Sequence, residues 1–81
     1  MPPEITSQIE SLIAEALPDA EIEVTAGSPG HYALVVRSEA FDGKRLVEKQ
    51  RMVYRAIAPL MGGDDAPVHA IDSLKTLPPS A

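Results

Sequence analysis

The sequence contains no cysteine and no tryptophan, and its 81 residues include one phenylalanine, two tyrosines and two histidines. The absence of cysteine excludes disulfides, cysteine-ligated zinc and a thiolate nucleophile from this chain. Because aromatic residues are scarce, the core must be built from Ile, Leu, Val, Ala and Met. The length suits one small domain, and we expect a single domain over residues 1–81 with an ordered core of about residues 4–78.

Long apolar runs are also missing. No segment approaches the roughly 20 apolar residues that span a bilayer, and the N-terminal "MPPEITSQIE" lacks the charged-then-apolar pattern of a signal peptide. The sequence shows no glycine-rich phosphate loop after a strand, no dense metal motif and no acid pair placed with a nucleophile. We therefore expect a cytoplasmic protein that is not an enzyme and does not associate with membranes.

The charged residues are unevenly distributed around a net charge of −5, which argues against general affinity for nucleic acids. Residues 1–26 carry six acidic side chains and no basic one. Residues 43–61 carry a single acid, Glu48, and five of the seven basic side chains: Lys44, Arg45, Lys49, Arg51 and Arg55. This basic segment could contact phosphates, dock an acidic partner surface, or form an ordinary solvated helix face.

The first half of the chain predicts a helix followed by a hairpin. Apolar residues recur at helical spacing from Ile5 to Leu17, and Pro18 disfavours continuation of the helix. The segments "AEIEVTA" and "HYALVVRS" are typical of strands, and the turn "GSPG" between them places Gly30 where a positive φ is needed. Two strands joined by a short turn indicate an antiparallel pair.

The second half predicts further helical structure and a third strand. The segment "RLVEKQRMVYRAIAPLM" indicates one helix, or a short helical turn that runs into a longer one, with a kink or break at Pro59. After the breaker-rich "GGDDAP", the third strand should begin near Val68. Phe41 precedes the helix, and we expect it to be buried with Val53 and Ile57 against the sheet. The first helix should add three residues to this core, Ile9, Leu12 and Ile13.

This order, αββααβ, belongs to the α+β class. A helical connection between the second and third strands makes them parallel, with a right-handed crossover. We therefore expect a three-stranded mixed sheet with the helices packed on one face. The other face should be partly open to solvent or to a partner.

The two histidines carry the remaining chemistry, because each stands at the start of a strand. If the second and third strands are adjacent and parallel, their first residues lie at the same edge of the sheet, and His31 and His69 could approach each other there, since neighbouring strands are about 4.8 Å apart. Two neutral imidazoles make half of a site for Fe, Zn or Cu, and the other ligands must come from elsewhere. The alternative is that each histidine caps a strand end or bonds to backbone groups.

Strand alternation also predicts the direction of the third-strand side chains. Val68 and Ala70 should face the helices, and His69 and Ile71 should face the other way. His69 would then lie near the rim of the sheet, where water satisfies it in the free protein.

The segments "FDGKRLVEKQRMVY", "VHAIDSLKTLPP" and "GHYALVV" together resemble the BolA family over nearly the whole chain. The stretch "EKQR" stands where BolA proper commonly has Arg-His-Arg, which favours the IbaG-like branch. The family fold is similar to a type II KH domain, and it agrees with the element order that the residues predict.

The resemblance implies partnership with a monothiol glutaredoxin and a bridging [2Fe–2S] cluster, in iron–sulfur trafficking or iron and redox sensing. The glutaredoxin and glutathione would supply thiolates, and the isolated chain would hold no cofactor. His69 matches the family's ligand on the last strand, and His31 is the candidate for the second ligand. The resemblance also implies an alternative, a DNA-binding transcriptional regulator that uses the KH-like helix surface. The oligomeric state of the isolated chain stays open between a monomer and a weak homodimer.

Overall fold

The computed structural model describes residues 4–63 and 66–79 of the chain. Their regular elements are, in chain order, α1 (Ile5–Ala16), β1 (Glu21–Ala26), β2 (His31–Arg37), α2 (Leu46–Ile57) and β3 (Ala70–Leu77). Single 3₁₀ turns flank α2, η1 at Glu39–Phe41 and η2 at Ala58–Leu60. The predicted order is confirmed with one difference. The predicted helical segment contains one α-helix, α2, because Pro59 lies two residues after its end at Ile57 and the chain continues there as a 3₁₀ turn.

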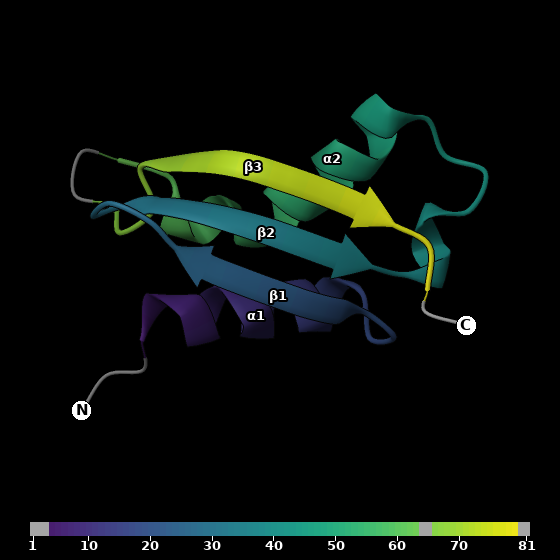
Figure 1. The fold of residues 1–81 in the computed structure, drawn as a ribbon, viewed down its shortest axis with the longest axis horizontal. Coiled ribbons are helices and arrows are strands. Elements are labelled where there is room, and N and C mark those ends of the chain that lie inside the picture. Colours follow the sequence, from purple (N-terminus) through teal and green to yellow (C-terminus); the bar gives the residue numbers. More distant parts are fainter. Residues whose placement is uncertain (1–3, 64–65, 80–81) are drawn as a thin grey trace.

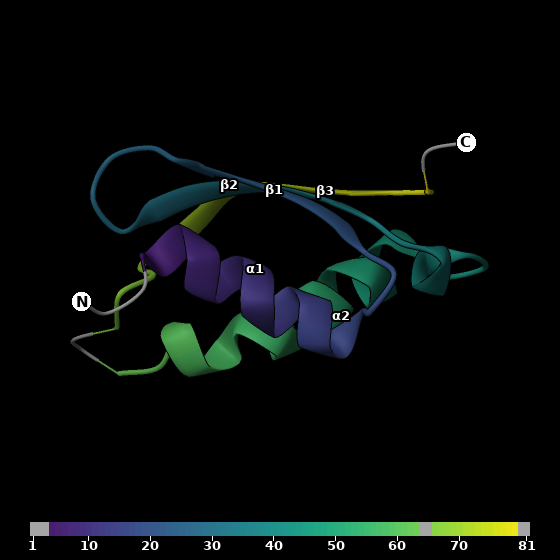
Figure 2. The same cartoon turned by 90° about the horizontal axis from the view of Figure 1, so that it is seen from below.

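The three strands form one mixed sheet in the order β1-β2-β3 (Figure 1). The β1–β2 hairpin is antiparallel, and β3 returns parallel to β2 after the crossover through α2. Both helices cover the same face of the sheet, and the described residues place no helix on the opposite face (Figure 2). The predicted sheet and layer arrangement are therefore confirmed. None of the helices in the described part of the chain is long and apolar enough to cross a bilayer.

The pairing of β2 with β3 is interrupted by a bulge. His31 pairs with Ala70 and Tyr32 with Ile71, but Ala33 then pairs with Ser73. One residue of β3, Asp72, is therefore left without a partner on β2. A bulge of this kind changes the direction of the side chains around it.

The start of the third strand corrects two predictions. The strand begins at Ala70 rather than near Val68, and Ile71 packs against the core although it was expected on the open face. The predicted alternation assumed an extended chain through Val68 and His69, whereas regular pairing starts only after them. Val68 is buried and His69 is exposed, as expected. Asp64 and Asp65 of the predicted loop lie outside the described residues.

The core lies between the sheet and the two helices. Each helix contributes a pair of buried residues spaced four apart, Ile9 with Ile13 and Val53 with Ile57. This spacing places both side chains of a pair on the same face of the helix. The predicted core is confirmed, with Leu12 only partly buried. The complete buried cluster is Ile9, Ile13, Leu17, Leu34, Val36, Phe41, Val53, Ile57 and Val68.

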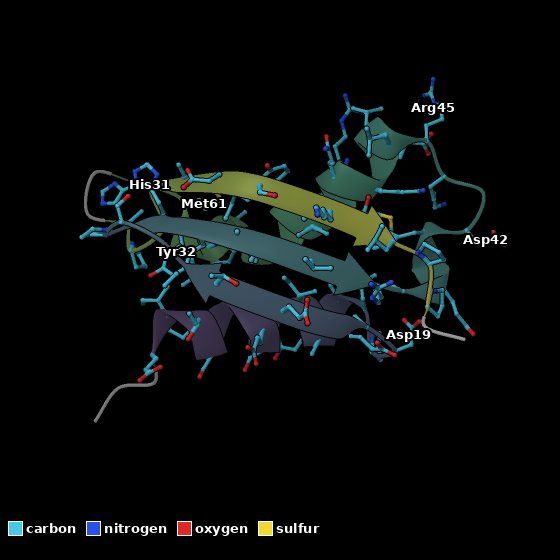
Figure 3. All side chains as sticks on the ribbon, in the orientation of Figure 1. Asp19, His31, Tyr32, Asp42, Arg45 and Met61 are labelled. Carbon is cyan, nitrogen blue, oxygen red and sulfur yellow. The ribbon has the colours of Figure 1, made fainter. Side chains whose placement is uncertain are left out.

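The loop that carries Phe41 is held by Asp19, which lies between α1 and β1 at the lower right of Figure 3. One carboxylate oxygen of Asp19 accepts from the hydroxyl of Ser38 and the other from the backbone N–H of Glu39, both at 2.7 Å. The Glu39 N–H, followed by the Ser38 hydroxyl, holds the pKa of Asp19 below its ordinary value of 3.8. The buried hydroxyl of Ser38 in turn accepts from the N–H of Ala40 at 3.1 Å. These bonds fix η1 in the orientation that buries Phe41.

We expect Phe41→Ala to cost about 3–5 kcal/mol of unfolding free energy, because the change leaves a cavity in a small core. The matched control is Leu46→Ala, since Leu46 is 63% exposed at the start of α2 and its loss should cost at most about 0.5 kcal/mol. Urea unfolding followed by circular dichroism measures both changes. Equal losses for the two variants would show that Phe41 is not a core anchor.

Candidate functional site

The first candidate site is the sheet rim where the β1–β2 turn meets the start of β3. We use "histidine rim" for Gly30, His31, His69 and Asp72. The carbonyl oxygen of Gly30 accepts hydrogen bonds from two backbone N–H groups, that of His69 at 2.8 Å and that of Ala70 at 3.1 Å. These bonds, with the His31–Ala70 pairing, bring both histidines to the same end of the sheet. The predicted juxtaposition of the two strand starts is therefore present.

Gly30 has a second role, because the His69 ring lies directly against it. A β-carbon at position 30 would stand 2.0 Å from Cδ2 of His69 and 2.8 Å from its Cγ, closer than real β-carbons come to other atoms. Gly30 also has a φ of +80°, as the turn prediction required. The turn thus supplies the backbone conformation for the hairpin and the space for the His69 side chain.

The imidazole of His69 is exposed to solvent. Within residues 4–63 and 66–79, the structure gives its ring nitrogens no hydrogen-bond partner, and only its backbone N–H is bonded. Neither ring nitrogen is therefore committed to a partner among these residues. For His69, the alternative that the imidazole hydrogen-bonds to backbone groups is therefore not observed among the described residues.

His31, at the left of Figure 3, is held differently. Its Nδ1 lies 2.9 Å from Oδ1 of Asp72, and the two side chains are 40% and 55% exposed. An ionised carboxylate can only accept a hydrogen bond, so this contact requires a proton on Nδ1, and in the neutral imidazole the lone pair is then on Nε2. Asp72 was not predicted as a site residue, because the alternation of side chains on a regular strand does not reveal a bulge.

The donor set fits half of a metal site. In the described part of the chain, no group of three or more His, Cys, Asp or Glu residues is arranged to hold a metal ion, and the chain has no cysteine. Two imidazoles at one exposed rim are suitable ligands for iron, and the remaining ligands would have to come from another molecule. His69 and His31 are the residues that would contribute.

The second candidate site is a surface groove along α2. It has a volume of about 430 Å³ and is lined by Lys44, Arg45, Glu48, Arg51, Met52 and Arg55. Arg45 donates from Nε to the carboxylate of Glu48 at 2.9 Å, and this bond is the main reason why the pKa of Glu48 is lowered. We call the four basic residues here, Lys44, Arg45, Arg51 and Arg55, the cationic groove.

The cationic groove contains four of the five basic residues that the sequence grouped together. Lys49 lies elsewhere, in a depression formed with Ser38, Phe41 and Pro78 among others. Figure 3 shows Arg45 and His31 toward opposite ends of the molecule. The groove and the histidine rim are therefore separate surfaces.

Comparison with known proteins identifies the class to which this small α+β domain with a histidine rim belongs. A family model described as BolA-like protein matches residues 9–80. The match covers most of the chain, and the chain belongs to the BolA-like protein family. The family prediction is thus confirmed, while the IbaG-like branch stays a prediction.

Individual relatives agree with this assignment. An uncharacterized protein in the rpoN–murA intergenic region of Acinetobacter guillouiae is 32% identical over 66 residues, which is 82% of this chain and 76% of that protein. A bolA protein homologue from Coxiella burnetii is 29% identical, with a TM-score of 0.73 over 91% of this chain and 90% of that chain. The BolA domain of SufE1 from Arabidopsis thaliana is 24% identical and shares the fold, with a TM-score of 0.77 over 98% and 96% of the two chains.

We expect Gly30→Ala to lower the stability by more than the backbone strain of a positive φ, because the added β-carbon also displaces the His69 ring. The matched control is Gly43→Ala, because Gly43 has a φ of +73° with nothing within 4 Å of an added β-carbon. The control should cost about 1 kcal/mol for backbone strain. Gly30→Ala should cost about 1–3 kcal/mol more, since the His69 ring must move.

Urea unfolding measures this difference in stability, and NMR spectra of the imidazoles follow the His69 ring. Only Gly30→Ala should shift the His69 ring signals. Equal stability losses and an unmoved His69 in both variants would contradict the close packing of His69 on Gly30.

Proposed function

We propose that this protein pairs with a monothiol glutaredoxin and that His69 and His31 co-ligate a [2Fe–2S] cluster bridging the two proteins. The observation that carries the proposal is the histidine rim, where His31 at the start of β2 and His69 directly before β3 lie at one exposed edge of the sheet. Membership of the BolA-like family supports it. The chain supplies no thiolate, so the glutaredoxin and glutathione would supply them. The protein would act in iron–sulfur cluster trafficking or in iron and redox sensing.

The residues of this chain would contribute binding and orientation. The side chain of His69 is exposed, and its backbone is anchored to Gly30 by a 2.8 Å hydrogen bond. His31 presents Nε2, because Nδ1 is engaged by Asp72. Imidazole ligation raises the reduction potential of such a cluster relative to ligation by cysteine alone. Accessible ligands at a rim suit a cluster that is transferred or sensed better than one that is stored.

We expect His69→Ala to leave folding nearly intact, because the side chain is exposed, and to weaken or alter the shared cluster. The wild-type protein should form a heterodimer with a cluster-loaded monothiol glutaredoxin in the presence of glutathione, with a changed visible circular dichroism spectrum. His69→Ala should shorten the lifetime of that cluster about 10-fold or more, since disturbing even an outer-shell partner of a ligand costs 10–100-fold in affinity.

His31→Ala tests the second ligand in the same assay, and its effect should be smaller than that of His69→Ala. Thr25→Ala, an exposed change on β1, is the control and should behave as wild type. The absence of a wild-type complex by size-exclusion chromatography would contradict the proposed function. Identical cluster spectra for wild type and His69→Ala would contradict the assignment of His69 as a ligand.

A second candidate function, DNA binding, is favoured by the cationic groove, because four basic side chains gather there on a protein with a net charge of −5. Phosphate contacts from such side chains give affinity that falls with salt. The groove is separate from the histidine rim, so the two functions can be tested independently.

Two charge-matched variants test DNA binding. One neutralises groove residues outside the Arg45–Glu48 pair, namely Lys44→Gln, Arg51→Gln and Arg55→Gln. The control neutralises the three bases outside the groove, namely Arg37→Gln, Lys49→Gln and Lys75→Gln. If the groove binds duplex DNA, the first variant should flatten the plot of log affinity against log salt by about 0.9 for each lost phosphate contact. A similar loss in both variants would mean that the groove has no specific role.

A further inference from the structure

The bulge in β3 places a carboxylate beside His31. Continued regular pairing after Tyr32–Ile71 would join Ala33 to Asp72, but Ala33 pairs with Ser73 instead. Asp72 is the extra residue of the bulge, and its side chain reaches back to His31, whose own strand partner is Ala70. The contact between Asp72 and His31 therefore follows from the bulge.

The neighbouring turn packs beside this contact at ordinary van der Waals distances. A β-carbon at Gly27 would stand 3.9 Å from Oδ2 of Asp72 and 3.6 Å from the carbonyl oxygen of His31. The N–H of Gly27 donates to that carbonyl at 2.9 Å, and the N–H of His31 donates to the carbonyl of Ser28 at 2.9 Å. The backbone of His31 is thus fixed on both sides, and the one remaining freedom is the orientation of its ring.

The contact between His31 and Asp72 contributes little to fold stability, because both side chains are largely exposed. With side chains 40% and 55% exposed, an ion pair or hydrogen bond of this kind contributes little to stability. Its geometric effect is larger, because one ring nitrogen is held at 2.9 Å and the ring can no longer rotate freely.

We propose that Asp72 is a positioning residue for His31: it accepts the Nδ1 proton, selects the tautomer with a free Nε2, and holds that nitrogen toward the rim for ligation. The proposal rests on the proposed function and deepens it. A carboxylate bonded to the second nitrogen of a ligating histidine fixes the ring and increases the basicity of the ligand nitrogen. The two histidines would then be ordered by different means, His69 by packing on Gly30 and His31 by the Asp72 carboxylate.

The first test uses the isolated protein without any metal. Long-range ¹H–¹⁵N NMR correlations identify the tautomer of each imidazole at about pH 8.5, where histidines are ordinarily neutral. Wild-type His31 should carry its proton on Nδ1, and Asp72→Ala should shift it toward the Nε2-protonated form. Asp72→Asn should retain the Nδ1 proton, because its amide oxygen still accepts a hydrogen bond. His69 is the internal control and should not change.

The second test measures the lifetime of the cluster shared with a monothiol glutaredoxin. Asp72→Ala should shorten it about 10–100-fold, the usual effect of removing such a partner, and Asp72→Asn should restore most of it. Asp42→Asn removes the same charge in an exposed loop at the other end of the molecule and should behave as wild type (Figure 3). The melting temperatures of all variants should stay close to that of the wild type.

The outcomes separate the two proposals. A wild-type protein that forms no complex contradicts the proposed function and, with it, any role of Asp72 in ligation. A wild-type complex with an unchanged lifetime in Asp72→Ala contradicts the positioning role alone. An Nε2-protonated His31 in the wild type, or an Asp72→Asn variant that behaves like Asp72→Ala, overturns the proposed hydrogen-bond mechanism.

Discussion

The parallel pairing of β2 with β3 is the constraint on which the rest of the structure depends. Strands that run parallel cannot be joined by a tight turn, so α2 must cross over the sheet between them. The crossover places α2 on the same face as α1, where the core forms between them and the sheet. The same pairing brings residue 31 beside residue 70 although they are far apart in the chain. The position of the core and that of the histidine rim therefore both follow from the pairing of β2 with β3.

The rim combines a rigid backbone with accessible side chains. Gly30, His69 and Ala70 are joined by backbone hydrogen bonds of 2.8 and 3.1 Å, so the positions from which the imidazoles extend are set by the sheet. The imidazoles themselves remain exposed or half-exposed. Residues that bind external ligands are commonly placed in this way, at the margin of a scaffold that holds them without burying them. The requirement for a glycine at position 30 comes from this closeness of turn and ring.

Charge is distributed on this fold so that two surfaces can act separately. The cationic groove follows α2, and the histidine rim lies at the turn end of the sheet (Figure 3). Of the six acidic residues in the first 26 positions, Glu4 is the N-cap of α1 and the other five lie in α1, β1 and the loop between them. One of them, Asp19, has a structural role, since it binds Ser38 and Glu39 and holds the Phe41 loop in place. A partner at either surface would therefore meet a local charge different from the net charge of the chain.

The sequence by itself determined the elements, the mixed sheet, the burial of Phe41 and the common edge of His31 and His69, because these follow from hydrophobic periodicity, turn residues and the handedness of crossovers. Only the tertiary structure decided the details of the last strand and of the basic segment. Ile71 packs against the core because regular strand pairing begins only at Ala70, so alternation counted from Val68 does not apply. Asp72 meets His31 because a bulge breaks the alternation from which side-chain directions are predicted. Lys49 lies apart from the groove, in a depression completed by Pro78 and Pro79. Both outcomes depend on contacts between distant segments, which local patterns of residues do not encode.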